Sequence, residues 1–369
     1  MTMRMPRRAF LGGCALVFSG CAAPRRDTIS PTGSKADGRI LFAVNDSHDA
    51  KRDGIWMLKN GANAQRIMAK DNAYALQYPR WVVGGGQGQT EERIAFVRAN
   101  DRGIYSDLYT ARADGTDQRQ LTNLRSRIQP GTDINAQYNY TVQSAVVSGV
   151  SYSSGGNFLT FVTDSAPEHT KQPGDLMRLW IAEDPTAQAG SPKTHIIAPT
   201  ANIGQPVDSS ALSPDGKYLV FTMLWQPAND PSKRTQLYLF NFATRQWRPL
   251  TETALPFGAY DPVFSPDGRF IAFAGRPDFR VNDIYIIARD GTTPPQKITE
   301  TGVARAPVFS PDGKKLAFVA NPDSGQFAIY SMDITPPADV ASPFTFGKPD
   351  KLTDVVDWID ARSGLSWTV

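Results

Sequence analysis

The side chains that most often carry catalysis or bind metals are few in this chain and lie far apart. The histidines are His48, His169 and His195, and this spacing does not favour the convergence that a metal site needs. The text GVSYS at 149–153 lacks the last glycine of a Gly-x-Ser-x-Gly nucleophile elbow. The glycine-rich stretch 84–88 is followed neither by Lys-Ser/Thr nor by a helical pattern. We therefore expect no catalytic residues, no metal site, no cofactor and no enzymatic activity.

One cysteine stands where a covalent modification is expected. The chain has two cysteines, Cys14 and Cys21, so residues after 21 offer neither a disulfide nor a thiol nucleophile. Cys21 ends an apolar run and follows two small residues, in the order Phe18-Ser19-Gly20-Cys21. This text resembles the lipobox of bacterial lipoproteins. The resemblance implies that Cys21 is the site of lipid attachment, and the alternative is a plain signal peptide cut near Ala23.

The first twenty residues are typical of a targeting segment. Arg4, Arg7 and Arg8 form a basic start, and residues 10–20 form an apolar run too short to span a bilayer. The text PRRAFLG resembles a twin-arginine export signal, and the general secretory route stays open. We expect a signal peptide at 1–20, a lipidated cysteine with a polar tether at 21–38, and a folded domain at 39–369. Such a protein is anchored by its lipid on the exported side of the membrane, at the periplasmic face or the outer membrane if two membranes exist.

Positive and negative charges balance in the chain after its first twenty residues. The chain holds 39 basic and 36 acidic residues, and its first twenty residues contain three arginines and no acid. The remainder is therefore neutral, which argues against a nucleic-acid partner, because such binding needs a concentrated basic surface.

The folded domain is organised by a repeat. Residues 260–299 read as strand, turn, strand, loop, strand, turn and strand, with Pro266-Asp267-Gly268 at the first turn. The pattern returns at 209–251 and 307–353, and its turn serines are Ser213, Ser265 and Ser310. Repetition of four short strands at this period indicates the blades of a propeller.

The three copies of FSPDG-like text followed by IAF-like text resemble the WD40-like repeats of TolB-type β-propellers. The resemblance implies an all-β, six-bladed propeller with four antiparallel strands in each blade. The last residues, GLSWTV, match a first strand and then stop. We expect this C-terminal strand to join blade one and close the ring, with Trp367 in the core. We expect the propeller to lack the α/β domain that precedes it in TolB.

Two places are expected to bind partners. Aligning the blades puts one set of polar residues at the mouth of the central channel: Gln77, Ser148, Asp208, Tyr260, Arg305 and Ser363, with Asp261 one step further in. The long loops, mainly 125–147, 164–175 and 224–235, are predicted on one face of the ring, where binding usually lies. They carry the candidate partner-binding residues Tyr138, Tyr140, Trp225 and His169.

The favoured interpretation is an exported cell-envelope lipoprotein that serves as a non-enzymatic protein-binding or assembly platform, with an envelope protein as its partner. The alternative is a carbohydrate-binding or carbohydrate-active propeller, lyase-like or hydrolase-like, that uses the channel mouth. Binding by aromatic residues on loops supports the platform, since aromatic side chains give large contact area at low entropic cost.

Overall fold

The computed structural model describes most of the chain from residue 38 onward. The described residues are 38–45, 50–60, 64–71, 74–82, 92–100, 106–122, 147–152, 158–163, 178–183, 193–196, 207–225, 234–251, 255, 258–278, 280–322, 327–353 and 359–369. The predicted lipidation site Cys21 and the loop residues Tyr138, Tyr140 and His169 lie outside them. Within the described part, no helix has the length and apolar character needed to cross a membrane.

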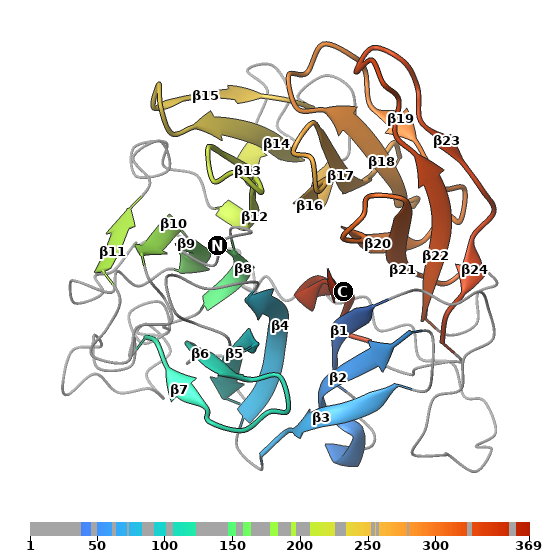
Figure 1. Ribbon diagram of the computed structural model, residues 1–369. Coiled ribbons are helices and arrows are strands. Elements are labelled where there is room, and N and C mark those ends of the chain that lie inside the picture. Colours follow the sequence, from blue (N-terminus) through green and yellow to red (C-terminus); the bar gives the residue numbers. More distant parts are fainter. Residues whose placement is uncertain are drawn as a thin grey trace, which may run out of the picture.

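The strands of the described residues form six antiparallel sheets arranged around a common centre (Figure 1). The first sheet contains β25 (Ser366–Thr368), β1 (Arg39–Val44), β2 (Gly54–Lys59) and β3 (Gln65–Ala69). The second contains β4 (Tyr74–Val82), β5 (Arg93–Asn100), β6 (Ser106–Arg112) and β7 (Arg119–Gln120). The third contains β8 (Val147–Tyr152), β9 (Phe158–Thr163), β10 (Arg178–Glu183) and β11 (Lys193–Ile196).

The other three sheets are built from the clearest repeats. The fourth contains β12 (Val207–Leu212), β13 (Tyr218–Trp225), β14 (Arg234–Asn241) and β15 (Gln246–Pro249). The fifth contains β16 (Ala259–Phe264), β17 (Phe270–Gly275), β18 (Asp283–Ala288) and β19 (Gln296–Lys297). The sixth contains β20 (Ala304–Phe309), β21 (Lys315–Ala320), β22 (Ala328–Thr335), β23 (Thr345–Phe346) and β24 (Asp350–Lys351). Two short 3-10 helices, η1 (Ala50–Arg52) and η3 (Ala361–Ser363), complete the described elements.

The sixth sheet corrects the prediction of four strands in every blade. Its third strand, β22, pairs with β23 through Ile334 and Phe346 and with β24 through Tyr330 and Lys351. This strand is eight residues long, so its two ends have room for different outer strands.

The first sheet is completed by the C-terminal strand, as predicted. Ile40 lies opposite Trp367, and Leu41 lies opposite Ser366, in an antiparallel pairing of β1 with β25. Trp367 is buried, with 8% of its surface exposed, and packs in the cluster that joins the first and sixth sheets. The two ends of the described chain thus share one sheet, which leaves no open edge at the junction.

The core repeats one aromatic pair from sheet to sheet. The second strand of each sheet, in the order of the blades, carries a phenylalanine with no more than 1% of its surface exposed: Phe42, Phe96, Phe161, Phe221, Phe273 and Phe318. Each lies opposite an aromatic residue of the third strand: Trp56, Tyr109, Trp180, Tyr238, Tyr285 and Tyr330. The rings of Phe273 and Tyr285, for example, are stacked with their centroids 5.9 Å apart. Stacked pairs of this kind add to the burial energy of the core.

The Ser-Pro-Asp-Gly turns share one hydrogen-bond pattern. In the fifth sheet the Ser265 hydroxyl donates to Asp267 at 2.6 Å and accepts the Phe270 N–H at 3.0 Å. Gly268 adopts a φ of 69°, a conformation that glycine takes without steric cost. The turns that begin at Ser213 and Ser310 repeat these contacts. The turns therefore fix the register of the first and second strands in each of these sheets.

Candidate functional site

The innermost strands carry a bulge at one shared position, which shapes the centre of the ring. The pairing of first and second strands slips after Gln77, Ser148, Val207, Tyr260 and Arg305. The residue after the slip has a positive φ at Tyr78 (52°), Asp261 (53°) and Ala306 (55°). Gly364, which follows Ser363 in the segment leading to β25, has a φ of 72°. A β-bulge bends its strand and redirects side chains, so this position turns side chains toward the channel.

This register corrects one predicted site residue. The sequence alignment placed Asp208 level with Tyr260 and Arg305, but the structure puts Val207 at that level, opposite Met223. Asp208 therefore corresponds to Asp261 and not to Tyr260. The shift is not visible in the sequence, because the fourth repeat lacks the proline that follows the bulge in the fifth and sixth repeats.

A cavity of about 260 Å³ lies along the innermost strands. It is lined by parts of β4, β12, β16 and β20, by prolines of the Ser-Pro-Asp-Gly turns, and by residues 362 and 364–367; we call it the central cavity. Five prolines contribute to its walls: Pro214, Pro262, Pro266, Pro307 and Pro311. Four aromatic residues line it as well: Trp81, Phe264, Phe309 and Trp367. The walls are therefore mostly apolar and are held by rigid rings.

The structure brings together three of the predicted channel-mouth residues. Arg305 donates to the Asp261 carboxylate through Nε and Nη2, each at 2.9 Å. The Arg305 guanidinium also lies over the Tyr260 ring, 5.5 Å from its centre. Asp261 lines the central cavity. This bidentate pair joins the first strands of the fifth and sixth sheets, because Asp261 belongs to β16 and Arg305 to β20.

The other predicted channel-mouth residues are placed as follows. Gln77 lies partly buried in β4, opposite Val97. Ser148 lies in β8, opposite Val162. Ser363 is fully buried, and its hydroxyl donates to Asp360 at 2.6 Å. The Ser363 hydroxyl is therefore already engaged within the protein. Its main-chain carbonyl, in contrast, accepts a hydrogen bond from Arg80 beside the central cavity. Trp225 of the predicted binding loops forms the last residue of β13, opposite Arg234.

Arg80 is not among the predicted site residues, although it lines the central cavity. Its Nη1 donates to the carbonyl of Pro79 at 2.8 Å and to that of Ser363 at 2.7 Å. Burial is the main cause that lowers the pKa of Arg80 to about 10, and the charges of Tyr78 and Asp261 oppose this shift. An arginine in the first strand of a blade, where the fifth and sixth repeats have Val263 and Val308, was the available signal.

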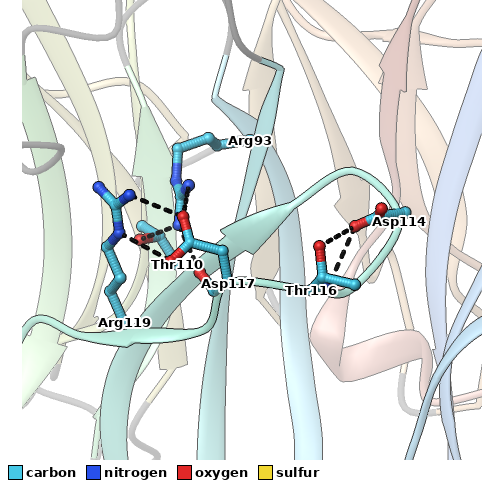
Figure 2. A network of polar contacts seen from close by, with 6 residues as sticks. All are labelled: Arg93, Thr110, Asp114, Thr116, Asp117 and Arg119. Atoms are coloured by element: carbon cyan, nitrogen blue, oxygen red, sulfur yellow. Dashed lines mark hydrogen bonds and ion pairs between the residues drawn. The ribbon is translucent and has the colours of Figure 1, made fainter.

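A second polar cluster lies outside the channel, on the second sheet. Asp117 accepts hydrogen bonds from Arg93 at 2.8 Å and from Arg119 at 2.7 Å (Figure 2). Those two arginines lower the pKa of Asp117 to about 2. Arg93 belongs to β5 and is 3% exposed, whereas Arg119 belongs to β7. The cluster ties the turn 113–118 to the sheet, and its residues do not line the central cavity.

Metal binding has no support in the described part of the chain, where histidine, cysteine and acidic residues form no group of three or more with metal-binding geometry. The central cavity has mostly apolar walls with prolines and an arginine at its side, a lining of the kind that holds ligands.

The fold and the central cavity define this protein as an all-β propeller. No family model and no curated protein matches its sequence. Among solved structures it is similar to TolB from Acinetobacter baumannii, with a TM-score of 0.59 and 16% identity over 89% of this chain and 66% of that one. It is also similar to putative TolB from Agrobacterium tumefaciens, with a TM-score of 0.53 and 14% identity over 92% and 99%. A chain of a nidogen/laminin complex gives a TM-score of 0.53 with 10% identity over 90% and 98%.

These likenesses establish a TolB-like propeller fold. The chain spans slightly less than two thirds of the Acinetobacter TolB chain. At such identities the likeness concerns the fold alone, and a propeller fold does not determine function.

Proposed function

We propose that this protein is an exported cell-envelope lipoprotein whose propeller binds a protein partner without chemical turnover. In this proposal the six sheets are the six blades of one closed ring, and a lipid on Cys21 holds the ring at the membrane. The lipobox-like text before Cys21 and the basic, apolar leader support the anchor.

The observation that carries the binding role is the size and lining of the central cavity. Its volume of about 260 Å³ falls below the range of roughly 300–1,000 Å³ typical of sites that enclose a whole small molecule. Such a space would accept a side chain or a chain end of a larger partner. Proline rings in the walls offer no N–H donors, so the cavity would recognise apolar groups and leave polar recognition to a few side chains.

The polar groups of the channel favour binding over catalysis. Asp261 is held by Arg305 and accepts the N–H of Ala306 at 3.3 Å. A carboxylate engaged in this way supports the arrangement of neighbouring strands, whereas a general base needs a free oxygen near its substrate. The engagement of Asp261 therefore disfavours a catalytic role for this residue in a carbohydrate-active protein.

The long loops would supply the rest of the partner surface. We propose that residues 125–147, the end of β13 and the connection to β14 contact the partner through Tyr138, Tyr140 and Trp225, and that His169 of 164–175 is a further contact residue. Aromatic residues at such positions are frequent energetic centres of interfaces.

The test is co-purification from solubilised native membranes with the full-length protein as bait. We expect the wild type to retain a discrete protein, and the combined variant Tyr138→Ala, Tyr140→Ala and Trp225→Ala to release it. A cavity-filling variant, Val263→Phe, should weaken retention as well. The matched control removes exposed aromatic side chains of outer strands, Trp247→Ala and Phe346→Ala, which are 38% and 45% exposed. The control should retain the partner.

The outcomes separate the alternatives. A partner retained by both the loop variant and the cavity variant contradicts the proposed surfaces. Retention of glycans without a protein supports carbohydrate binding, and cleavage of an oligosaccharide by the purified protein contradicts the non-enzymatic role. Melting temperatures of all variants, measured alongside, show whether a loss of binding reflects a loss of fold.

A further inference from the structure

Arg80 places a cation beside the central cavity, and its described hydrogen bonds go to neutral main-chain acceptors. Both of its described hydrogen bonds use Nη1 and go to main-chain carbonyls, those of Pro79 and Ser363. Among the residues that the structure describes, no carboxylate hydrogen-bonds to its guanidinium. Arg80 is partly buried, and a charge that has lost part of its surrounding water gains from an anionic partner. The surroundings of the Arg80 side chain therefore favour the binding of an anion.

The backbone around Arg80 is arranged to accommodate the guanidinium. Gly364 has a φ of 72°, and a Cβ on it would lie 2.7 Å from Nη2 of Arg80. Only glycine leaves that space open. The Ser363 carbonyl is fixed in turn, because Asp360 caps η3 by accepting the N–H groups of Arg362 and Ser363. This cradle holds Nη1 and leaves Nε and Nη2 for another acceptor.

A second arginine of the channel shows how those two nitrogens are used. Arg305 binds the Asp261 carboxylate through Nε and Nη2, each at 2.9 Å. Nε and Nη2 of Arg80 have no acceptor among the described residues. The charge of Asp261 interacts favourably with Arg80, but both carboxylate oxygens of Asp261 already accept hydrogen bonds from Arg305. A further cation, the exposed Arg362, also lines the cavity.

We propose that Arg80 binds the carboxylate of a ligand in the central cavity through Nε and Nη2. The guanidinium fork matches the two oxygens of a carboxylate. The apolar part of the ligand would pack on Trp81, Phe264, Phe309 and Trp367, which line the same cavity. The carboxylate can come from the end of a polypeptide chain or from a small organic acid. This site deepens the proposed binding role, because it lies in the cavity that carries that role; it requires neither the lipid anchor nor the loop surface, so its failure is distinguishable from theirs.

The binding experiment uses the full-length protein in detergent and the tryptophan indole signals of the ¹⁵N-labelled chain, because Trp81 and Trp367 line the cavity. The probes are N-acetylphenylalanine and its amide, which differ in the carboxylate. We expect saturable shifts with the acid and at least about tenfold weaker binding of the amide, since a site built for a hydrogen-bonded group discriminates against analogues that lack it. Equal binding of acid and amide, or no saturable binding of the acid, overturns the proposal.

Two further probes distinguish the source of the carboxylate. The tetrapeptide Ala-Ala-Ala-Phe with a free C-terminus represents a chain end, and succinate represents a small organic acid. Tighter binding of the tetrapeptide than of succinate assigns the site to a chain end, and the reverse order assigns it to a small acid. Either order supports the carboxylate site, whereas binding of neither contradicts it.

Three variants connect the preference to Arg80. Arg80→Gln should abolish the difference between acid and amide, and Arg80→Lys should leave part of it, because lysine keeps the charge and loses the fork. Arg362→Gln, which removes the exposed cation of the same cavity, should change acid binding by less than about threefold. If Arg80→Gln fails to fold, the proposal is still tested by comparing acid and amide binding in the wild type and in Arg80→Lys. A folded Arg80→Gln that keeps the preference for the acid overturns the assignment.

Discussion

Arg305 and Asp261 form a bidentate ion pair between the first strands of neighbouring sheets, with Nε and Nη2 each 2.9 Å from a carboxylate oxygen. The pair is sheltered, because the two side chains are 29% and 13% exposed. Asp261 occupies the bulge of β16 with a φ of 53°. One residue therefore satisfies two requirements: a carboxylate for the neighbouring strand and a backbone conformation that aspartate tolerates better than most residues.

The first prediction concerns this pair. Asp261→Asn should lower the free energy of unfolding by about 1–3 kcal/mol, because the charged hydrogen-bond partner of Arg305 is lost. Asp261→Ala should cost about 1 kcal/mol more, since alanine is strained at positive φ. Urea denaturation measures both.

The matched control is Asp333→Asn. Asp333 pairs with Lys315 at 2.6 Å but is 78% exposed, and exposed pairs contribute at most about 1 kcal/mol. Equal losses for Asp261→Asn and Asp333→Asn would show that burial of the channel pair has no energetic consequence.

The second prediction concerns closure of the ring. Deletion of residues 365–369 removes β25, the partner of β1. It also removes the main-chain oxygen of Val369, which accepts hydrogen bonds from Arg39 at 2.9 and 3.1 Å. We expect the whole propeller to lose stability, since β1 then becomes an open edge. Trp367→Ala alone should cost about 3–5 kcal/mol, as for other buried aromatic residues.

Thermal melting and urea unfolding measure the effect of closure. Val369→Ala is the control, because Val369 is 82% exposed and its main-chain oxygen is retained. A truncated chain that melts at the temperature of the full chain would mean that the pairing of β1 with β25 contributes nothing to stability.

Much of the fold follows from the sequence because its signals are local and repeated. The Asp-Gly turns after Ser213, Ser265 and Ser310 are held by hydrogen bonds between residues at most six positions apart. A short sequence motif is therefore enough to predict them. The match of the last strand to a first strand predicted closure through Trp367, which the structure confirms. Repeats of similar length and text let one clear copy identify weaker ones.

The site was harder to predict, since it depends on register and on contacts between distant residues. The one-residue shift of Asp208 arises from a bulge, which adds a residue to one strand without changing its composition. Arg80 gains its environment from Ser363, 283 residues away. A single sequence shows an arginine in a strand but not the glycine and carbonyl that surround it in the closed ring.

The third prediction concerns the anchor. Cys21→Ser should prevent lipid attachment and move the protein from the membrane to the soluble exported fraction, because serine has no thiol to accept the lipid. Metabolic labelling with a palmitate analogue, followed by fractionation, measures this. Cys14→Ser is the control, since Cys14 lies within the predicted leader and should not affect labelling. An unlabelled wild-type protein contradicts the lipoprotein interpretation.

The fourth prediction concerns acid stability and the polar cluster of the second sheet. Asp117 lies between Arg93 and Arg119, whereas Asp114 on the same turn is bound by Thr116 (Figure 2). The arginines lower the pKa of Asp117 to about 2, from an ordinary value of 3.8. A lowered pKa in the folded state means that the carboxylate stabilises the fold at pH values above 3.8. This contribution declines as the pH falls from 3.8 and is lost once the pH passes below about 2.

Asp117→Asn should therefore lower the melting temperature at pH 7 and flatten its decline between pH 4 and pH 2, the window set by these two pKa values. The pKa of Asp114 is also lowered, mainly by its hydrogen bond from Thr116, so Asp114→Asn is a matched control without an arginine hydrogen-bonded to its carboxylate. We expect a smaller effect from Asp114→Asn, because it leaves the ion pair with buried Arg93 in place. Melting curves at several pH values measure both variants. If the two variants reduce the melting temperature equally at pH 7 and show the same pH dependence, the arginines do not stabilise the fold through Asp117.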